Sequence, residues 1–92
     1  MVSRKVRVIN TTGLHLRPAG NLCKEAMQFK SNVFFRYGEN GETGEANAKS
    51  VLSILGACVK RGDEIEIVCD GEDEEQALNR LTEAISSGLG EL

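Results

Sequence analysis

The sequence predicts an α/β (α+β) fold of the open-faced sandwich type, in which three helices cover one face of a four-stranded, mostly antiparallel sheet. Alternating apolar and polar residues, the pattern of half-buried strands, mark three segments, and a glycine-rich hairpin supplies a fourth strand. Helical spacing or a short apolar run marks three helices. The predicted order is strand, helix, strand, strand, helix, strand, helix. Because each strand has one apolar face, a single helical layer is enough to cover the sheet.

The first strand is predicted around Val6 and Val8, which alternate with Lys5 and Arg7. Asn10–Gly13 then forms a turn. The first strand therefore ends shortly before the chain reverses direction.

The first helix is predicted from about Leu16 to Phe29. Its apolar residues recur with helical spacing: Leu16, Ala19, Leu22, Cys23, Ala26 and Met27. Pro18 falls in the first turn, where the missing N–H of proline and its fixed φ are tolerated. His15, the only histidine of the chain, therefore lies at the entrance of this helix.

The second strand is predicted over Asn32–Tyr37, with Val33, Phe35 and Tyr37 on one side and Phe34 and Arg36 on the other. Gly38–Glu45 reads as a hairpin loop, with a short return strand within Glu42–Ala46.

A short helix is predicted over Val51–Cys58, with the Ser50 hydroxyl as its N-cap. This helix is apolar nearly all round, so part of Val51, Leu52 and Leu55 should stay exposed as a docking surface. The alternative is that the hairpin covers these side chains.

The last part of the chain reads as turn, strand and helix. Lys60–Asp63 is the turn, Glu64–Cys69 alternates as a strand, and the acidic run Asp70–Glu75 opens the helix. The buried stripe of this helix is expected to be Ala77, Leu78, Leu81, Ala84 and Ile85. Ser86–Gly88 ends the helix, and Leu89–Leu92 is expected to fray.

Composition predicts one domain over residues 1–92, of the ordinary soluble globular kind, with 27% charged and 40% hydrophobic residues. The net charge of −3 argues against a nucleic-acid partner. No signal peptide or membrane-length apolar run is visible, so a cytoplasmic location without membrane insertion is expected. Cys23 and Cys69 read as core residues and Cys58 is ambiguous; no metal site is expected, and a redox role is a minor alternative.

His15 and Arg17 are the candidate chemical groups. A helix entrance carries backbone N–H groups without helical partners and the positive end of the helix dipole, so it attracts anions. Arg17 adds a fork-shaped cation suited to phosphate oxygens. Together these groups predict an imidazole that carries a phosphoryl group. The structural alternative is that His15 only caps the helix or lies on the surface.

The segment Gly13–Ala19, Gly-Leu-His-Leu-Arg-Pro-Ala, resembles the active-site signature of the HPr family of histidine-containing phosphocarriers, which usually has alanine where this chain has Leu16. Asn47–Ser50 resembles the second signature of that family, around a regulatory serine, and Gly71–Glu74 resembles the start of its last helix. The resemblance covers nearly the whole chain. The spacing between His15 and Ser50 is about four residues longer than usual, which a surface hairpin accepts.

The resemblance implies the HPr fold and a role in the phosphoenolpyruvate-dependent sugar phosphotransferase system. Phosphate would pass from enzyme I to Nδ1 of His15 and on to an enzyme IIA domain, with Arg17 and nearby backbone N–H groups stabilising it. The chain would be a monomeric carrier without a cofactor rather than a stand-alone enzyme. The residues expected to bind partners are Leu16, Pro18, Ala19, Lys49, Val51, Leu52 and Leu55.

Two other function classes stay open. In a regulatory paralogue, HPr kinase/phosphorylase would phosphorylate Ser50 for binding to a catabolite-control transcription factor, or the chain would serve a nitrogen-linked phosphorelay. A branch that regulates without phosphohistidine would lack His15, which is present. A small hydrolase with His15 as base is disfavoured, because no second histidine or nucleophile constellation is visible.

Overall fold

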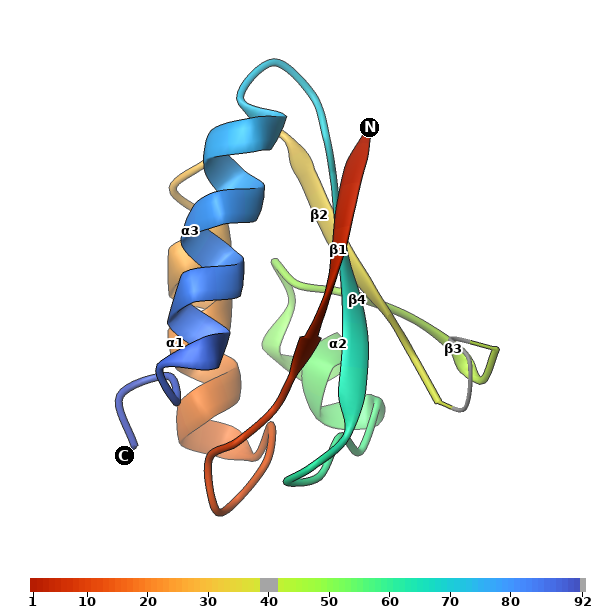
Figure 1. The fold of residues 1–92 in the computed structure, drawn as a ribbon, viewed down its shortest axis with the longest axis vertical. Helices are drawn as coiled ribbons and strands as arrows, with labels where there is room; N and C mark the ends of the chain where they lie inside the picture. The colour runs from red at the N-terminus through yellow and green to blue at the C-terminus, as the bar shows by residue number, and fades with distance from the viewer. Residues whose placement is uncertain (39–41, 92) are drawn as a thin grey trace.

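The computed structural model describes residues 1–38 and 42–91 (Figure 1). Within these ranges the elements follow the predicted order of strand, helix, strand, strand, helix, strand, helix. They are β1 (Val2–Arg7), α1 (Leu16–Ala26), β2 (Asn32–Tyr37), β3 (Gly44–Asn47), α2 (Val51–Gly56), β4 (Glu64–Asp70) and α3 (Glu74–Ser86).

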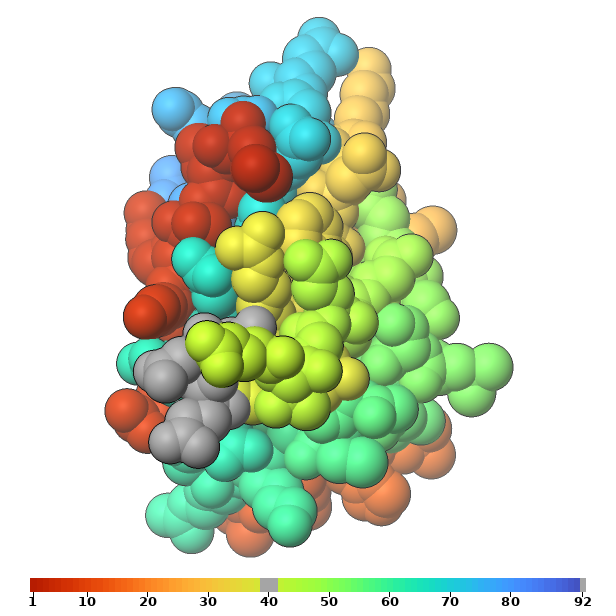
Figure 2. Space-filling view, turned by 90° about the vertical axis from the view of Figure 1, so that its right-hand side faces the viewer, coloured from red at the N-terminus to blue at the C-terminus, as the bar shows by residue number. Residues whose placement is uncertain are grey.

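The four strands form one sheet in the order β1-β4-β2-β3, and all neighbouring strands are antiparallel. Val6 pairs with Ile65, and Phe35 pairs with both Ile67 and Ala46, so inward-facing apolar residues line up across the sheet. The helices lie on one side of the sheet (Figure 1). Figure 2 looks onto the strands from the other side. The predicted fold class is confirmed.

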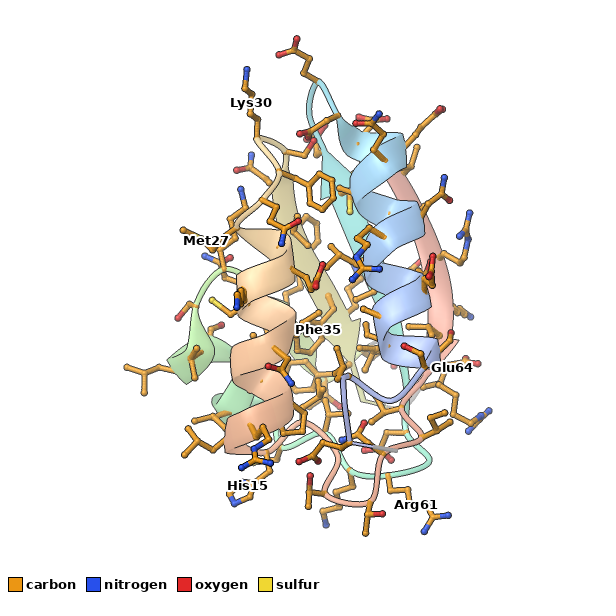
Figure 3. The ribbon with its side chains drawn as sticks, turned by 90° about the vertical axis from the view of Figure 1, so that its left-hand side faces the viewer. His15, Met27, Lys30, Phe35, Arg61 and Glu64 are labelled. Carbon is orange, nitrogen blue, oxygen red and sulfur yellow. The ribbon has the colours of Figure 1, made fainter. Side chains whose placement is uncertain are left out.

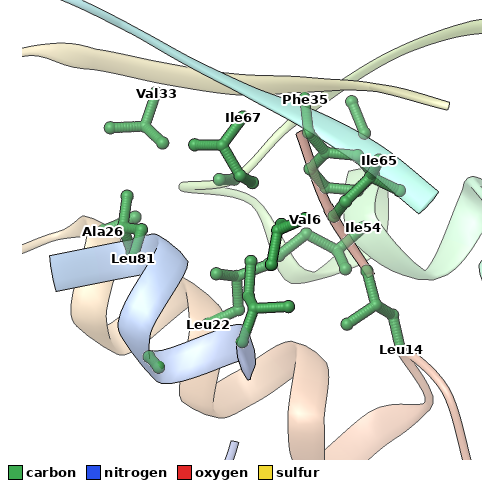
Figure 4. Close-up of a cluster of buried hydrophobic side chains, with 14 of the residues drawn as sticks. Val6, Leu14, Leu22, Ala26, Val33, Phe35, Ile54, Ile65, Ile67 and Leu81 are labelled. Atoms are coloured by element: carbon green, nitrogen blue, oxygen red, sulfur yellow. The ribbon is translucent and has the colours of Figure 1, made fainter. Parts of the chain in front are cut away.

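The hydrophobic core lies between the sheet and the helical layer (Figure 4). Phe35, Ile65 and Ile67 come from the sheet, while Leu22 and Leu81 come from α1 and α3, and all five are at most 1% exposed. The predicted stripe of α3 is buried as expected: Ala77, Leu78, Leu81, Ala84 and Ile85. The core therefore fixes the position of α1, the helix that follows His15.

Two helices end earlier than the sequence predicted. α1 ends at Ala26 because the next amides bond three residues back, from Gln28 N–H to Glu25 O and from Phe29 N–H to Ala26 O, both at 3.2 Å. α2 ends at Gly56, since Cys58 has a φ of 53° and cannot continue a right-handed helix.

The return strand of the hairpin occupies Gly44–Asn47, slightly later than the predicted range of Glu42–Ala46. The hairpin residues 39–41 lie outside the described part of the chain.

The expected fraying of the C-terminal residues is wrong for Leu89 and Glu91. Leu89 is only 4% exposed, and Asn21 donates a hydrogen bond of 2.7 Å from Nδ2 to its carbonyl. Thr12 donates from its hydroxyl to Glu91 Oε1 at 2.7 Å. The tail thus returns to the loop before α1. Leu92 lies outside the described residues.

Asp73 joins the start of α3 to the loop before β2. Its carboxylate accepts hydrogen bonds from the amides of Lys30 and Ser31, both at 2.9 Å, and from the Ser31 hydroxyl. These bonds, the one from the Ser31 hydroxyl first, lower the pKa of Asp73 from an ordinary 3.8 to about 2. Within the acidic run, Asp73 therefore stabilises a loop junction.

We expect Asp73→Ala to remove one component of acid unfolding. Because folding lowers the pKa of Asp73, its stabilising contribution is complete above pH 3.8 and is lost as the pH falls through about 2. Melting temperatures at neutral pH and at about pH 2 measure this. Wild type should lose more than Asp73→Ala, and a control, Glu72→Ala at an exposed position, should behave like wild type. An equal loss in wild type and Asp73→Ala would contradict the assignment.

Candidate functional site around His15

The loop that carries His15 is fixed by the segment before β4. Gly13 N–H donates to Asn10 O at 3.0 Å, which confirms the predicted turn. Gly13 has a φ of 63°, and a Cβ there would clash with Val59 O, so only glycine fits. Leu14 is buried, and its N–H donates to the same Val59 carbonyl at 3.0 Å. The backbone is therefore held on both sides just before His15.

His15 occupies the N-cap position of α1, as the sequence predicted. Its backbone is extended, with φ −79° and ψ −172°, and its carbonyl accepts the first helical hydrogen bond from Ala19 N–H at 2.8 Å. The side chain is exposed and makes no capping bond. Figure 3 shows His15 and Arg61 at one end of the molecule and Lys30 at the other. The imidazole is accessible to a partner.

The entrance of α1 can receive an anion. Within the described residues, the N–H groups of Leu16 and Arg17 have no hydrogen-bond acceptor. Pro18, the next residue, has no N–H. The Arg17 side chain is exposed and forms no ion pair within residues 1–38 and 42–91. These donors and the positive end of the α1 dipole suit the oxygens of a phosphoryl group.

The predicted partner contacts are divided between the surface and the core. Leu16 and Leu52 are 63% and 82% exposed, so the described part of the hairpin does not cover Leu52. Val51 and Leu55 are half-buried against the core. We define Leu16, Val51, Leu52 and Leu55 as the apolar patch.

Pro18 and Ala19, which the sequence assigns to partner contact, are buried, so their side chains offer no exposed surface in this structure. Both lie in the first turn of α1, on the side that faces the core. Met27 was not predicted as an exposed residue, yet it is 62% exposed at the end of α1 (Figure 3).

Ser50 caps α2 as predicted, because its hydroxyl accepts a hydrogen bond from Ser53 N–H at 3.2 Å. The ammonium of Lys49 is engaged by a backbone carbonyl and not by Ser50. Its ammonium donates to Phe29 O at 2.7 Å, which ties the start of α2 to the end of α1. A phosphate on Ser50 would have to compete with this carbonyl for the lysine.

The three cysteines differ in their surroundings. Cys69 is buried, and burial raises the pKa of its thiol to about 11. Cys23 is half-buried and Cys58 is exposed. Among the residues that the structure describes, no cluster of histidine, cysteine and carboxylate side chains is arranged to hold a metal ion. No helix in the described ranges is long and apolar enough to span a membrane.

Sequence reasoning missed three groups that support the loop. Asn10 is buried and donates to Gly13 O, Val59 accepts from Leu14, and Glu91 accepts from Thr12. Asparagine is common in turns, which is the only signal that pointed to Asn10. The other two contacts join residues 45 and 79 positions apart, and no local pattern reveals them.

Comparison with known proteins places the chain in a family. The family model for the phosphotransferase-system HPr component phosphorylation site matches residues 2–87. HPr-like protein Crh of Bacillus subtilis (strain 168) is 40% identical over 88% of this chain and 91% of its own length. Phosphocarrier protein HPr of Neisseria meningitidis serogroup A is 32% identical over 99% of this chain and 98% of its own.

Solved structures give the same result. The crystal structure of HPr-C-His from Thermoanaerobacter tengcongensis has a TM-score of 0.89 and 32% identity, covering 100% of this chain and 99% of that chain. The solution structure of Crh, the Bacillus subtilis catabolite repression HPr, has a TM-score of 0.64 and 37% identity, with 91% and 95% coverage. The chain also spans 21% of the multiphosphoryl transfer protein of Vibrio cholerae serotype O1, at 38% identity. This chain belongs to the HPr family of phosphocarrier proteins.

Proposed function

We propose that this protein carries a phosphoryl group on His15, receives it from enzyme I and passes it to enzyme IIA of a sugar phosphotransferase system. In this role it is a relay in the cytoplasm and not a stand-alone enzyme. The observation that carries the proposal is the position of His15, which is exposed at the N-cap of α1. Beside it lie two N–H groups without acceptors in the described chain and the unpaired guanidinium of Arg17.

The chemistry needs a nucleophilic nitrogen and moderate stabilisation of charge. A ring nitrogen of neutral His15 uses its lone pair to form the N–P bond, while the bond from phosphorus to enzyme I breaks and its electron pair stays with the donor. The amides of Leu16 and Arg17 stabilise the charge on the phosphoryl oxygens. The exposure of the site allows the second partner to remove the group in the same way.

Incubation of the wild-type chain with phosphoenolpyruvate and enzyme I tests this proposal. Intact-mass measurement should show the gain of one acid-labile phosphoryl group, and addition of an enzyme IIA domain should remove it. Omission of enzyme I is the control and should leave the mass unchanged. Failure of the wild-type chain to gain phosphate under conditions where another HPr gains it would refute the carrier role.

We expect Arg17→Ala to slow transfer both to and from His15, with Arg17→Lys between alanine and wild type. The guanidinium offers a planar fork that matches phosphate oxygens, whereas the lysine ammonium supplies charge alone. Removal of one preorganised donor to a developing negative charge typically lowers kcat by about 10²- to 10³-fold. Rapid-quench kinetics with enzyme I in one direction and enzyme IIA in the other measures both steps. Lys30→Ala, at the opposite end of the molecule, is the control (Figure 3). Wild-type rates in Arg17→Ala would exclude a role for the guanidinium.

A second candidate function is regulatory phosphorylation at Ser50 by HPr kinase/phosphorylase, followed by binding to a catabolite-control transcription factor. The chain is 40% identical to Crh, which is known as the Bacillus subtilis catabolite repression HPr, and this similarity favours the second candidate. Ser50 is half-buried at the start of α2, next to the exposed Leu52. The two functions are compatible in one protein.

A further inference from the structure

Asn10 is a buried polar residue in a loop at the surface. It is 0% exposed, and its Oδ1 has no hydrogen-bond partner in the described chain. The other buried polar side chains among the described residues behave differently, because the Ser31 hydroxyl donates to Asp73 and the Thr82 hydroxyl donates to Leu78 O. A buried acceptor without a partner destabilises the folded state. The hydrogen bond that the side chain does make, from Nδ2 to Gly13 O, is therefore the contact to explain.

Asn10 holds the backbone of Gly13 through two hydrogen bonds, one from its side-chain amide and one to its main-chain carbonyl. Asn10 Nδ2 donates to Gly13 O, and Asn10 O accepts from Gly13 N–H at 3.0 Å. At the Cα of Gly13, Val59 O and Lys60 Cα lie so close that no Cβ fits. Gly13 is thus held both by Asn10 and by the segment before β4, and we call this arrangement the clamp.

The clamp determines where the imidazole lies. Leu14 is buried and bonded to Val59 O, and His15 follows it directly. No hydrogen bond within the described residues holds the His15 side chain itself. The position of the imidazole relative to the entrance of α1 therefore depends on the backbone of residues 13 and 14.

We propose that Asn10 is a positioning residue for phosphoryl transfer, whose side-chain amide holds Gly13 so that His15 stays beside the free N–H groups of α1. The inference rests on the proposed function of His15. Asn10 does not touch the phosphoryl group, so it acts on the geometry of the transfer and not on the docking of partners.

The test compares Asn10→Ala with Asn21→Ala. Asn21 is the matched control because its Nδ2 also donates to a backbone carbonyl, that of Leu89, but holds the C-terminal tail. With enzyme I as donor, we expect Asn10→Ala to lower kcat about tenfold or more, since small misplacements of reacting groups have effects of this size. KM should stay within about twofold of wild type, because the docking surface is unchanged. Asn21→Ala should keep the wild-type kcat.

A second pair keeps the test decisive if Asn10→Ala does not fold. Serine and cysteine have similar shapes at position 10, but only the hydroxyl is a good hydrogen-bond donor to Gly13 O. Asn10→Ser should therefore transfer several times faster than Asn10→Cys. Equal kcat values in this pair, a wild-type kcat in Asn10→Ala, or the same loss in Asn21→Ala would each overturn the inference. Absence of phosphorylation in the wild-type chain would instead overturn the proposed function.

Discussion

Replacing His15 by alanine is expected to abolish the acid-labile phosphate that enzyme I and phosphoenolpyruvate add to the wild-type chain. His15 is the only histidine in the sequence, so no other imidazole can accept the group. The fold should survive, because the side chain is exposed and makes no capping bond, and such surface changes cost about 0.5 kcal/mol or less. Intact mass and the melting temperature together distinguish loss of the acceptor from loss of the fold.

Thr11→Ala is the matched control for this experiment. Thr11 is exposed in the same loop, and its side chain has no hydrogen bond within the described residues. It should gain phosphate like wild type. An unchanged mass gain in His15→Ala would show that another residue accepts phosphate, and the proposed site would then be wrong.

The sequence predicted most of the fold because local patterns carry it. Asn32–Tyr37 was predicted with the bounds that β2 has, since its alternation matches a strand with one face in the core. The end of α2 was not predictable in the same way. Cys58 takes a left-handed conformation that its residue type does not favour, so no local preference marked the end of the helix.

The candidate site was predictable in position but not in its supports. A proline at the third helical residue and the apolar spacing that follows it predicted that His15 precedes the helix. The bond from Leu14 to Val59 joins two segments through the folded core, so no sequence pattern contains it. Pro18 and Ala19 belong to the active-site signature, yet both are buried. A sequence signature identifies the residues of a site, but it does not tell which side of the helix each of them faces.

The surroundings of Ser50 lead us to expect that a negative charge there slows phosphate transfer from enzyme I. Ser50 is half-buried at the N-cap of α2, and α2 packs against α1, the helix that starts after His15. The apolar patch contributes exposed Leu16 from α1 and exposed Leu52 from α2. A partner that covers both leucines would have to desolvate or repel a charge placed on Ser50. Lys49 offers little compensation, because its ammonium is bonded to Phe29 O.

We therefore expect Ser50→Asp to accept phosphate from enzyme I at least about tenfold more slowly than wild type, because a like or desolvated charge at an interface costs several kcal/mol. Ser50→Ala is the control and should accept phosphate at the wild-type rate, while losing about 1 kcal/mol of stability with the bond to Ser53 N–H. Treatment with HPr kinase/phosphorylase and ATP should modify wild type but not Ser50→Ala. Transfer rates at matched protein concentration, with melting curves beside them, separate the two effects. If Ser50→Asp and wild type accept phosphate equally fast, Ser50 is a helix cap alone, and the patch around Leu52 does not take part in docking to enzyme I.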